Sequence, residues 1–404
     1  MSVSVGFISL GCSKNLVDSQ VMAGYLKAGR IALAPSPEAA DIILVNTCAF
    51  IEAAREEAAE AILSACAHKA NGHCRAVIVA GCMVQRYRAR LEKAFPEVDA
   101  FLGIDELERI GEVVRRVADG QRCGVVAGRG EAVKLYNPSY PTLLFTGGPF
   151  AYLKIADGCN HRCAYCAIPL IRGRFRSRAM DDVVAEAAGM VSAGVRELNL
   201  IAQDSLMYGA DQARKPRIAE LMRRIDALEG EFRFRILYGY PSGVTDEVIE
   251  VLNTARHVCK YLDLPIQHSH PDVLKAMNRA AAVAATQGLA ARLRQAVPGV
   301  VLRTTCLVGF PGETEAHFEH LLAAVGAAKF DHLGVFAYSP EEGTSAFDRE
   351  APDPEIAEER CRRLMALQKK IVRERVKTLT GTRDTALLLR RGAAGVWQAR
   401  LPRQ

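Results

Sequence analysis

Short apolar segments alternate with segments of helical period along two long stretches of this chain. From 3 to about 117 the apolar segments are VSVGFIS, DIILVN, RAVIVAG and VDAFLG, and helical patterns begin near 16, 50, 84 and 106. From 151 to about 340 the apolar segments are AYLKIA, ELNLIA, FRFRILY, YLDLPIQ, VLRTTCLVG and HLGVFAYS. Strands that alternate with helices predict parallel sheets covered by helices. We therefore predict an α/β fold, with a small parallel α/β domain followed by a partial (βα)6 TIM-like barrel.

Composition limits what the cysteines can be for. The chain has 404 residues, 50% of them hydrophobic, and nowhere do 18 uncharged apolar residues run together. The N-terminus lacks the basic and small-residue pattern of a signal peptide. These features predict a cytoplasmic protein with no membrane association. In such a protein, twelve cysteines are expected to be metal ligands, redox groups or buried thiols rather than disulfides.

The stretch DGCNHRCAYC places Cys159, Cys163 and Cys166 in the loop that leaves the first predicted barrel strand. Three thiolates with C-x3-C-x2-C spacing can hold three irons of a 4Fe-4S cluster and leave the fourth iron for a non-protein ligand. A zinc site completed by His161 is an alternative, although this histidine lies inside the loop with poor reach. Inert thiols are a third interpretation, and the spacing favours the iron-sulfur cluster.

A second set of cysteines follows three strands of the N-terminal domain. Cys12, Cys48 and Cys82 come just after the first, second and third predicted strands. Parallel strands deliver their carboxyl ends to one edge of a sheet, and neighbouring strands lie about 4.8 Å apart. Any one of these residues could be an ordinary buried thiol. Three in matching positions, two of them preceded by Gly11 and Gly81, predict a second metal-cluster site.

These motifs resemble those of a known family. C-x3-C-x2-C, with an aromatic residue before the last cysteine and a six-unit barrel downstream, resembles the radical S-adenosylmethionine (SAM) superfamily. The stretches SLGCSKNLVDS, NTCAF, GCMVQRY, AYLKIADGCNHRCAYCAIPLIRGRFRSR, YLDLPIQH, VGFPGETE and YSPEEGT resemble the methylthiotransferase family within it, over about residues 1 to 375. The details GCSKN, VDS, QRY and EEGT are more similar to the RimO branch than to the MiaB branch.

The resemblance implies cofactors, a reaction and partners. It assigns an auxiliary 4Fe-4S cluster to the first cysteine set and the radical SAM 4Fe-4S cluster to the second, with SAM as radical source and methyl donor. The reaction implied is methylthiolation of the β-carbon of an aspartate of ribosomal protein S-twelve, free or in the small subunit. An electron donor such as flavodoxin or ferredoxin is implied as well. Two alternatives are methylthiolation of N6-isopentenyladenosine at C2 in tRNA and a non-catalytic iron-sulfur or electron-transfer protein.

Four further residues are candidates for SAM binding at the carboxyl ends of the barrel strands. Tyr165 is predicted to lie near the adenine, or simply to pack in its loop. Gln203 follows the second barrel strand, where it could bind sugar hydroxyls. Arg303 could meet the SAM carboxylate, with an ion pair to Asp263 as the rival interpretation. Gly309 could allow close approach of the backbone to SAM, or serve a tight turn.

Other polar and thiol groups receive structural predictions. The arginine-rich stretch RGRFRSR (172–178) is predicted to be a solvated face rather than a guide for an acidic or RNA-bearing substrate. His268 and His270 follow a barrel strand, where they could line the cavity or be satisfied polar groups. The remaining cysteines are expected to be structural or incidental thiols; they are Cys66, Cys74, Cys123, Cys259, Cys306 and Cys361.

The predicted organisation has five parts: a methylthiotransferase domain (1–118), a linker (119–148), a radical SAM core barrel (149–350), a C-terminal helix (351–378) and a tail (379–404). Members of the resembled family usually end in a small β-barrel, TRAM. Here TALLLRR and GVWQARL predict only two strands, so the tail is a short basic segment in place of a full TRAM barrel. From 361 to 404 twelve Lys and Arg face two acidic residues. This charge permits contact with RNA or a ribosomal surface, and a solvated basic helix with a frayed end is the alternative interpretation.

Overall fold

The computed structural model describes residues 3–125, 140, 142–286, 288–392 and 395–402. Its contacts divide the chain into two compact units. Unit 1 comprises 1–147 with 167–174, and unit 2 comprises 148–166 with 175–404. The finer five-part division stays a prediction, and half of the predicted linker lies outside the described residues.

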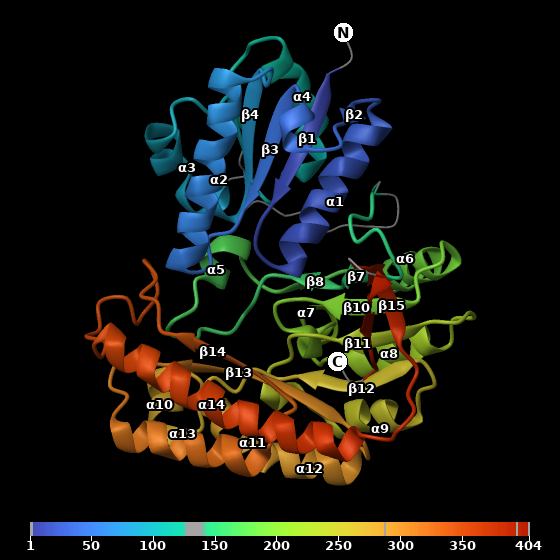
Figure 1. Ribbon diagram of the computed structural model, residues 1–404, viewed down its shortest axis with the longest axis vertical. Helices are drawn as coiled ribbons and strands as arrows, with labels where there is room; N and C mark the ends of the chain where they lie inside the picture. The colour runs from blue at the N-terminus through green and yellow to red at the C-terminus, as the bar shows by residue number, and fades with distance from the viewer. Residues whose placement is uncertain (1–2, 126–139, 141, 287, 393–394, 403–404) are drawn as a thin grey trace. The chain divides into compact units, whose positions relative to one another are not determined.

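Unit 1 is built on a six-stranded parallel sheet (Figure 1). The strand order is β2-β1-β3-β4-β5-β6. Its strands are β1 (Ser4–Ser9), β2 (Ala32–Leu33), β3 (Ile42–Thr47), β4 (Ala76–Gly81), β5 (Ala100–Leu102) and β6 (Cys123–Val125). The four strands predicted from the apolar pattern are confirmed. The pattern missed β2, because a two-residue strand is too short to show an alternation. Strand β6 lies in the predicted linker.

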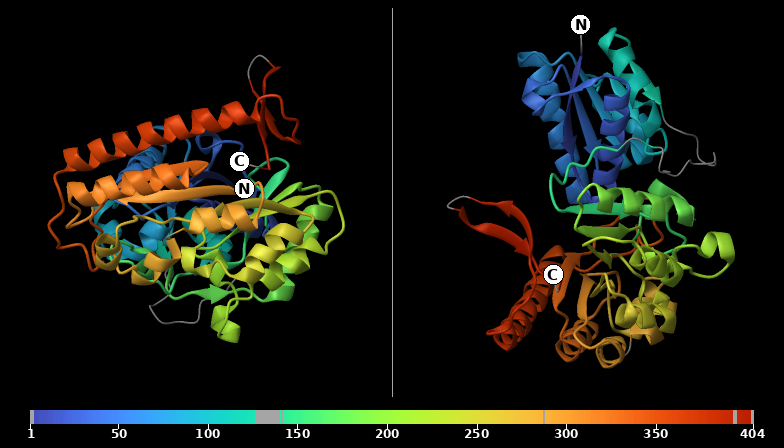
Figure 2. Two further views of the ribbon diagram at one scale, coloured as in Figure 1. Left: turned by 90° about the horizontal axis from the view of Figure 1, so that it is seen from below. Right: turned by 90° about the vertical axis from the view of Figure 1, so that its right-hand side faces the viewer.

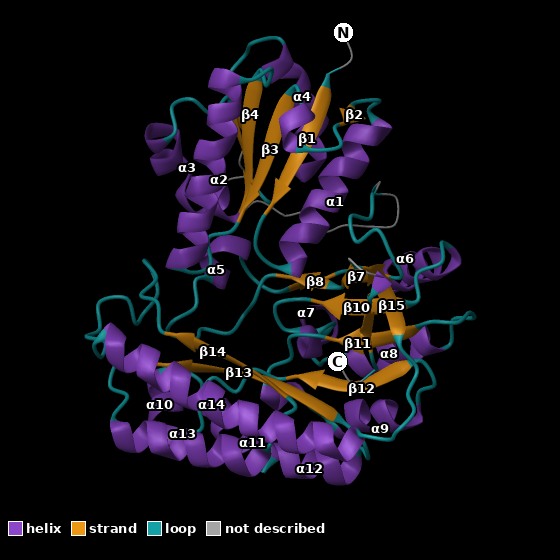
Figure 3. Ribbon diagram, viewed as in Figure 1, coloured by secondary structure: helices purple, strands orange, loops and turns teal. Residues whose placement is uncertain are grey.

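Helices cover both faces of this sheet, as Figure 3 shows. They are α1 (Ser13–Ala28), η1 (Pro37–Ala39), α2 (Glu52–Asn71), α3 (Cys82–Ala94), η2 (Leu107–Arg109), α4 (Ile110–Ala118) and α5 (Ile168–Arg172). Successive residues of a strand point to opposite faces. Ile43 and Val45 accordingly pack in one buried cluster with residues of α2, α3 and α5, whereas Ile42 and Leu44 pack in another with residues of α1 and α4. Both faces are apolar, which explains the uninterrupted apolar strand sequences.

Unit 2 contains an open, six-stranded parallel sheet with the strand order β14-β13-β12-β11-β10-β7. Its strands are β7 (Phe150–Lys154), β10 (Glu197–Ile201), β11 (Arg233–Ile236), β12 (Val258–Asp263), β13 (Val301–Val308) and β14 (His332–Ala337). All six correspond to predicted segments. Because each neighbour in the sheet is also the neighbour in sequence, the order is that of a (βα) barrel that stays open between β7 and β14.

The connections of unit 2 are mainly helical. They are η3 (Ser205–Met207), η4 (Pro241–Gly243), α6 (Met180–Ser192), α7 (Ala210–Ala213), α8 (Ile218–Asp226), α9 (Asp246–Thr254), α10 (Pro271–Ala276), α11 (Ala280–Thr286), α12 (Leu289–Ala296) and α13 (Glu315–Ala328). A short antiparallel pair, β8 (Ala156–Asp157) and β9 (Arg176–Ser177), brackets the cysteine loop. Among the described residues, no helix has the length and apolar character needed to cross a membrane.

The C-terminal part of unit 2 consists of a long helix and a hairpin. Helix α14 (Pro354–Leu379) lies beside α13, where Arg363 pairs with Glu315 and Glu319 (Figure 2). Strands β15 (Leu387–Arg391) and β16 (Trp397–Arg400) form an antiparallel pair. Arg400 reaches the fully buried Glu197 with a 2.6 Å ion pair, which anchors β16 to the sheet. The two strands predicted for the tail are thus confirmed, and the described residues show no barrel there.

Candidate functional site

The three cysteines of unit 1 follow three adjacent parallel strands. Cys12 lies three residues after β1, Cys48 directly follows β3, and Cys82 directly follows β4 and begins α3. The register pairs Ser9 with Asn46 and Thr47 with Gly81, so these strands end at the same level. The topology therefore brings together the three loops that carry the predicted ligands of one cluster.

A fully buried asparagine ties these three loops to one another. The Nδ2 atom of Asn15 donates to the carbonyl oxygen of Leu10 at 2.7 Å and to those of Asn46 and Thr47 at 3.3 Å. The Sγ atom of Cys82 lies 4.0 Å from Asn15 Oδ1, at the limit for a hydrogen bond from a thiol. One amide thus contacts the loop after β1, the end of β3 and the cysteine that follows β4. The sequence motif GCSKN contains this residue, but its role was not predicted.

Two glycines next to the cysteines are required by the backbone. Gly11 and Gly81 have φ angles of +84° and +99°, where a side chain is strained. A Cβ atom on Gly11 would lie 2.8 Å from Cys48 Cβ, and one on Gly81 would lie 2.3 Å from Asn46 Oδ1. These contacts explain why small residues precede two of the three cysteines.

The segment 172–178 is not the solvated face that its sequence predicts. Arg172 is 3% exposed and Arg178 is 2% exposed. Within unit 1, the Nη2 atom of Arg172 contacts the buried Asp18 at 2.8 Å and donates to Cys82 Sγ at 3.4 Å. Arg178 pairs with Glu186 at 2.6 Å. The prediction is wrong for these two arginines because folding brings a carboxylate to each guanidinium, that of Asp18 from far away in the sequence and that of Glu186 from α6, which a local charge pattern cannot show.

The charges around the first cysteine set act unequally on its thiols. Burial alone would raise the pKa of Cys12, but Lys14, Arg172 and backbone amides at the start of α1 lower it below the usual 9.0. Burial raises the pKa of Cys48 and raises the pKa of Cys82 to about 12. A metal centre supplies the positive charge that holds three such thiols as thiolates together.

The second cysteine set lies in unit 2, in the loop between β8 and β9. Neighbouring segments hold this loop through its backbone: Ala164 N donates to Met277 O at 2.9 Å, and Asn278 Nδ2 donates to Arg162 O at 2.7 Å. The buried Arg279 adds a hydrogen bond from Nη1 to Cys163 Sγ at 3.5 Å. These contacts come from the three residues that follow α10, more than a hundred positions away along the chain, and no sequence pattern predicted them.

The zinc interpretation of the second set has little support in the geometry. His161 Nε2 lies 2.7 Å from the buried carboxylate of Asp204, and its ring stacks on Tyr240 with centroids 4.0 Å apart. The sulfurs of a tetrahedral zinc site would lie within about 4 Å of one another. Among the described residues, neither cysteine set has all its ligand atoms within 4.8 Å of one another. This arrangement of the thiols does not match a single tetrahedral ion.

Each residue predicted to bind SAM has a protein partner. Arg303 pairs with Asp263 at 3.1 Å, as the rival interpretation stated. Gln203 Nε2 donates to Asp157 Oδ1 at 2.8 Å, while its Oε1 is buried without a hydrogen-bond partner among the described residues. Tyr165 packs against a buried apolar cluster, and its hydroxyl lies 3.4 Å from Arg279 Nη1. Contacts to SAM therefore stay predictions for these residues.

Gly309 has a structural requirement of its own. Its φ angle is +73°, and a Cβ atom there would lie 2.6 Å from Ala357 Cβ in α14. The backbone amides of Gly309 and Phe310 both donate to the buried Glu313 carboxylate. The close approach seen here is thus to a helix, and an approach to SAM stays a prediction.

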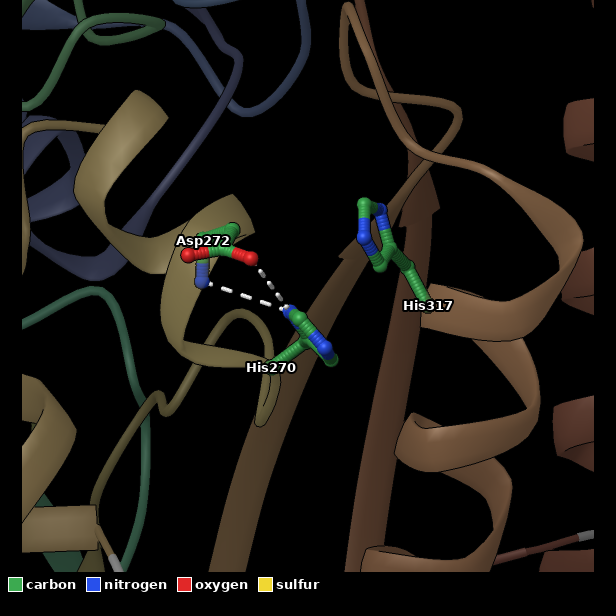
Figure 4. A group of neighbouring side chains, drawn as sticks. All are labelled: His270, Asp272 and His317. Carbon is green, nitrogen blue, oxygen red and sulfur yellow. Dashed lines mark hydrogen bonds and ion pairs between the residues drawn. The ribbon is translucent and has the colours of Figure 1, made fainter.

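His268 and His270 have different environments in the structure. His268 is fully buried and lies 3.5 Å from Glu313. His270 lies near Asp272 and His317, and the three ligand atoms are within 4.8 Å of one another (Figure 4). The Nδ1 atoms of His270 and His317 already accept hydrogen bonds from backbone amides of Asp272 and Thr314, at the starts of α10 and α13. These two histidines therefore serve as helix caps, as satisfied polar groups would.

Comparison with protein families agrees with the two-unit architecture. Residues 4–103 match the family described as "Uncharacterized protein family UPF0004", and residues 153–325 match the "Radical SAM superfamily". The ribosomal protein uS12 methylthiotransferase RimO of Symbiobacterium thermophilum is 45% identical over 97% of this chain and 80% of its own length. The chain belongs to the RimO family. The RimO protein of Geobacter sulfurreducens is 43% identical over 95% of this chain and 86% of its own length.

Solved structures agree with the fold of this RimO family member. The radical SAM methyltransferase TsrM from Kitasatospora setae matches with a TM-score of 0.62 and 14% identity, over 86% of this chain and 77% of its own. The cobalamin-dependent radical SAM enzyme OxsB matches with a TM-score of 0.54 and 13% identity, over 92% of this chain and 56% of its own. At these identities the likeness supports the α/β fold alone.

Proposed function

We propose that this chain is a radical SAM methylthiotransferase that methylthiolates the β-carbon of an aspartate of ribosomal protein uS12. The observation that carries the proposal is the pair of cysteine sets, one after strands of the parallel sheet of unit 1 and one in the loop between β8 and β9 of unit 2, in a chain whose relatives are named for this activity. A methyltransferase without sulfur insertion would leave the first set unexplained. Mononuclear zinc would fit neither set.

The residues present fit two iron-sulfur clusters. Each set offers three thiolates and thus leaves one iron for a ligand from outside the chain. Cys12, Cys48 and Cys82 would hold the auxiliary cluster, and the second set would hold the cluster that binds SAM. When bound, these groups supply a 5′-deoxyadenosyl radical, sulfur and a methyl group.

The chain's own residues orient and shield the cluster loops. Asn15 fixes the three cysteine-bearing segments of unit 1 relative to one another. The segment 277–279 fixes the cysteine loop of unit 2. Buried contacts of this kind keep ligands in one geometry and limit the access of water, which protects a radical from side reactions.

The remaining partners form part of the proposal. The substrate is uS12, free or within the small ribosomal subunit, and the basic segment 361–404 would contact RNA or the ribosomal surface. A low-potential donor such as flavodoxin or ferredoxin would deliver electrons. A reducing cytoplasmic location is consistent with two clusters held by thiolates.

The alternative functions lack a specific supporting observation. The relatives reported above carry the uS12 name rather than a tRNA name. A purely electron-transferring protein would have no need for an open iron in each of two clusters. We therefore keep uS12 modification as the conclusion.

Mass spectrometry of uS12 from a deletion strain tests the reaction. Replacement of a hydrogen by SCH3 adds about 46 Da to the protein. We expect this increment to be lost on deletion and restored by the intact gene, but not by a gene that lacks either cysteine set. Loss of methylthio-adenosine from tRNA with uS12 unchanged would instead support the tRNA alternative.

Iron analysis tests the two clusters directly. Anaerobically reconstituted protein should hold about eight irons per chain. Replacement of Cys12, Cys48 and Cys82 by alanine should leave about four, and the same change in the second set should do so too. A matched triple replacement of Cys66, Cys74 and Cys123, which lie outside both sets, should leave about eight. A parent protein with only about four irons would contradict the proposal.

A further inference from the structure

Each cysteine set is contacted by one buried arginine. In unit 1, Arg172 is 3% exposed and donates from Nη2 to Cys82 Sγ at 3.4 Å. In unit 2, Arg279 is 4% exposed and donates from Nη1 to Cys163 Sγ at 3.5 Å. The same chemical arrangement, a guanidinium directed at one of three ligand sulfurs, thus occurs at both predicted cluster sites.

Other contacts fix both guanidinium groups in place. Arg172 Nη2 lies 2.8 Å from a carboxylate oxygen of Asp18, which is 1% exposed. Arg279 donates from Nη2 to the carbonyl oxygen of Pro265 at 2.8 Å, and its guanidinium carbon lies 4.1 Å above the Tyr240 ring centroid. A buried cation held by several contacts keeps one position and is little screened by water. Its electrostatic effect on the sulfur is therefore constant.

We propose that Arg172 and Arg279 are positioning residues that set the reduction potentials of the two clusters, each through one charge-assisted hydrogen bond to a ligand sulfur. This inference rests on the proposed function, in which each cysteine set holds a 4Fe-4S cluster. Reduction adds one negative charge to a cluster that is already anionic with three thiolates. A fixed positive donor stabilises the reduced form more than the oxidised form, and the reduction potential rises.

Asp18 provides a second and opposite perturbation at the auxiliary cluster. The Asp18 carboxylate offsets the positive charge of Arg172. Neutralising this carboxylate should therefore increase the net positive potential at the cluster. Asp18→Asn should therefore raise the potential, whereas Arg172→Gln should lower it. Lys14, the other buried cation near Cys12, is unchanged in both variants. A purely structural role of the pair would give loss of the cluster in both variants, without opposite shifts.

The test uses full-length chains that carry one cysteine set at a time. For the auxiliary cluster, Cys159, Cys163 and Cys166 are replaced by alanine, and for the radical SAM cluster the first set is replaced. Each protein is reconstituted anaerobically and its iron is counted. A redox titration followed by electron paramagnetic resonance then gives the midpoint potential.

We expect a clear shift in each set. Arg172→Gln and Arg279→Gln should each move the one-electron equilibrium at least tenfold toward the oxidised cluster, a fall of about 59 mV. Arg172→Lys and Arg279→Lys keep the charge and should recover at least half of that shift. Arg178→Gln serves as the control, because this arginine is as deeply buried but pairs with Glu186 and the Lys154 carbonyl instead of a cysteine. In this variant the one-electron equilibrium should stay within threefold of that in the parent protein.

Each outcome separates the inference from the proposed function. If a single-set parent holds no cluster, the assignment of that set fails. If clusters load fully and the glutamine variants keep the parent potential, the inference is refuted while the function stands. If Asp18→Asn does not fold, the double variant Arg172→Gln/Asp18→Asn decides: its potential must lie above that of Arg172→Gln alone. Loss of the cluster in both the glutamine and lysine variants would show a structural role and overturn the inference.

Discussion

Removal of the Asn15 side chain should loosen all three cysteine loops of unit 1 together. Asn15→Ala deletes the 2.7 Å hydrogen bond to Leu10 O and the two longer ones to Asn46 O and Thr47 O. Asn46 O keeps the backbone amide of Leu10 as a donor at 3.0 Å. The main loss is therefore one short, partly buried bond, together with the loss of this donor by the Leu10 carbonyl.

The magnitude follows from these contacts. A buried hydrogen bond contributes about 1 kcal/mol, and an unsatisfied buried group costs about 1–3 kcal/mol. We expect Asn15→Ala to destabilise the closed loops by about 2–3 kcal/mol, which increases the population of locally open forms about 30- to 150-fold. The cluster should then be lost faster, because its ligands are held less firmly.

Native-state hydrogen exchange measures this change directly. The amides of Leu10 and Leu16 donate to Asn46 O and Cys12 O and thus report on the loop and the first turn of α1. Their exchange should accelerate, and iron should be released faster to a chelator. The matched control is Asn199→Ala in unit 2, whose Nδ2 makes one 3.3 Å bond to Ala151 O.

Two results would refute the reasoning. One is an acceleration below about threefold at both amides, which would show that the amide contributes less than about 0.7 kcal/mol. The other is an equal acceleration in Asn199→Ala, which would show that the effect is not local to the cysteine loops.

Two other predictions concern the barrel unit. Burial alone would raise the pKa of Glu197, but three arginines hold this pKa below its usual 4.5. The ionised carboxylate therefore stabilises the fold at pH values above 4.5. This stabilisation is lost as the pH falls through the lowered pKa of the folded state. Glu197→Gln should lower the free energy of unfolding by about 2–4 kcal/mol at pH 7 and speed hydrogen exchange in β16, which carries Arg400. The loss of stability, measured by urea unfolding, should become smaller below about pH 4. A loss that is independent of pH would contradict this assignment. Gly309→Ala should lower stability by about 2–4 kcal/mol, because it adds a clash with Ala357 to the strain of a positive φ. Gly312 also has a positive φ, of +83°, but open space around it, so Gly312→Ala should lower the stability by about 1 kcal/mol. Equal thermal shifts in the two variants would rule out the contact with α14.

The sequence determined the α/β architecture and most of its strands. Uninterrupted apolar segments separated by helical patterns leave few solutions other than covered parallel sheets, because both faces of such strands must be buried. The same pattern places Cys12, Cys48 and Cys82 at the ends of three strands. These features are local, with periods and spacings of a few residues, and are therefore visible in a linear chain.

Only the tertiary structure decided which groups surround the cysteines. Arg172 is 154 positions from Asp18, and Arg279 is 116 positions from Cys163, so no local pattern relates the partners. The arginine-rich stretch was predicted to be solvated because isolated charges avoid burial. In the fold, Arg172 is buried because a buried carboxylate and a thiol lie beside its guanidinium. Such pairing depends on how distant elements pack, and the charge pattern of the sequence does not contain this information.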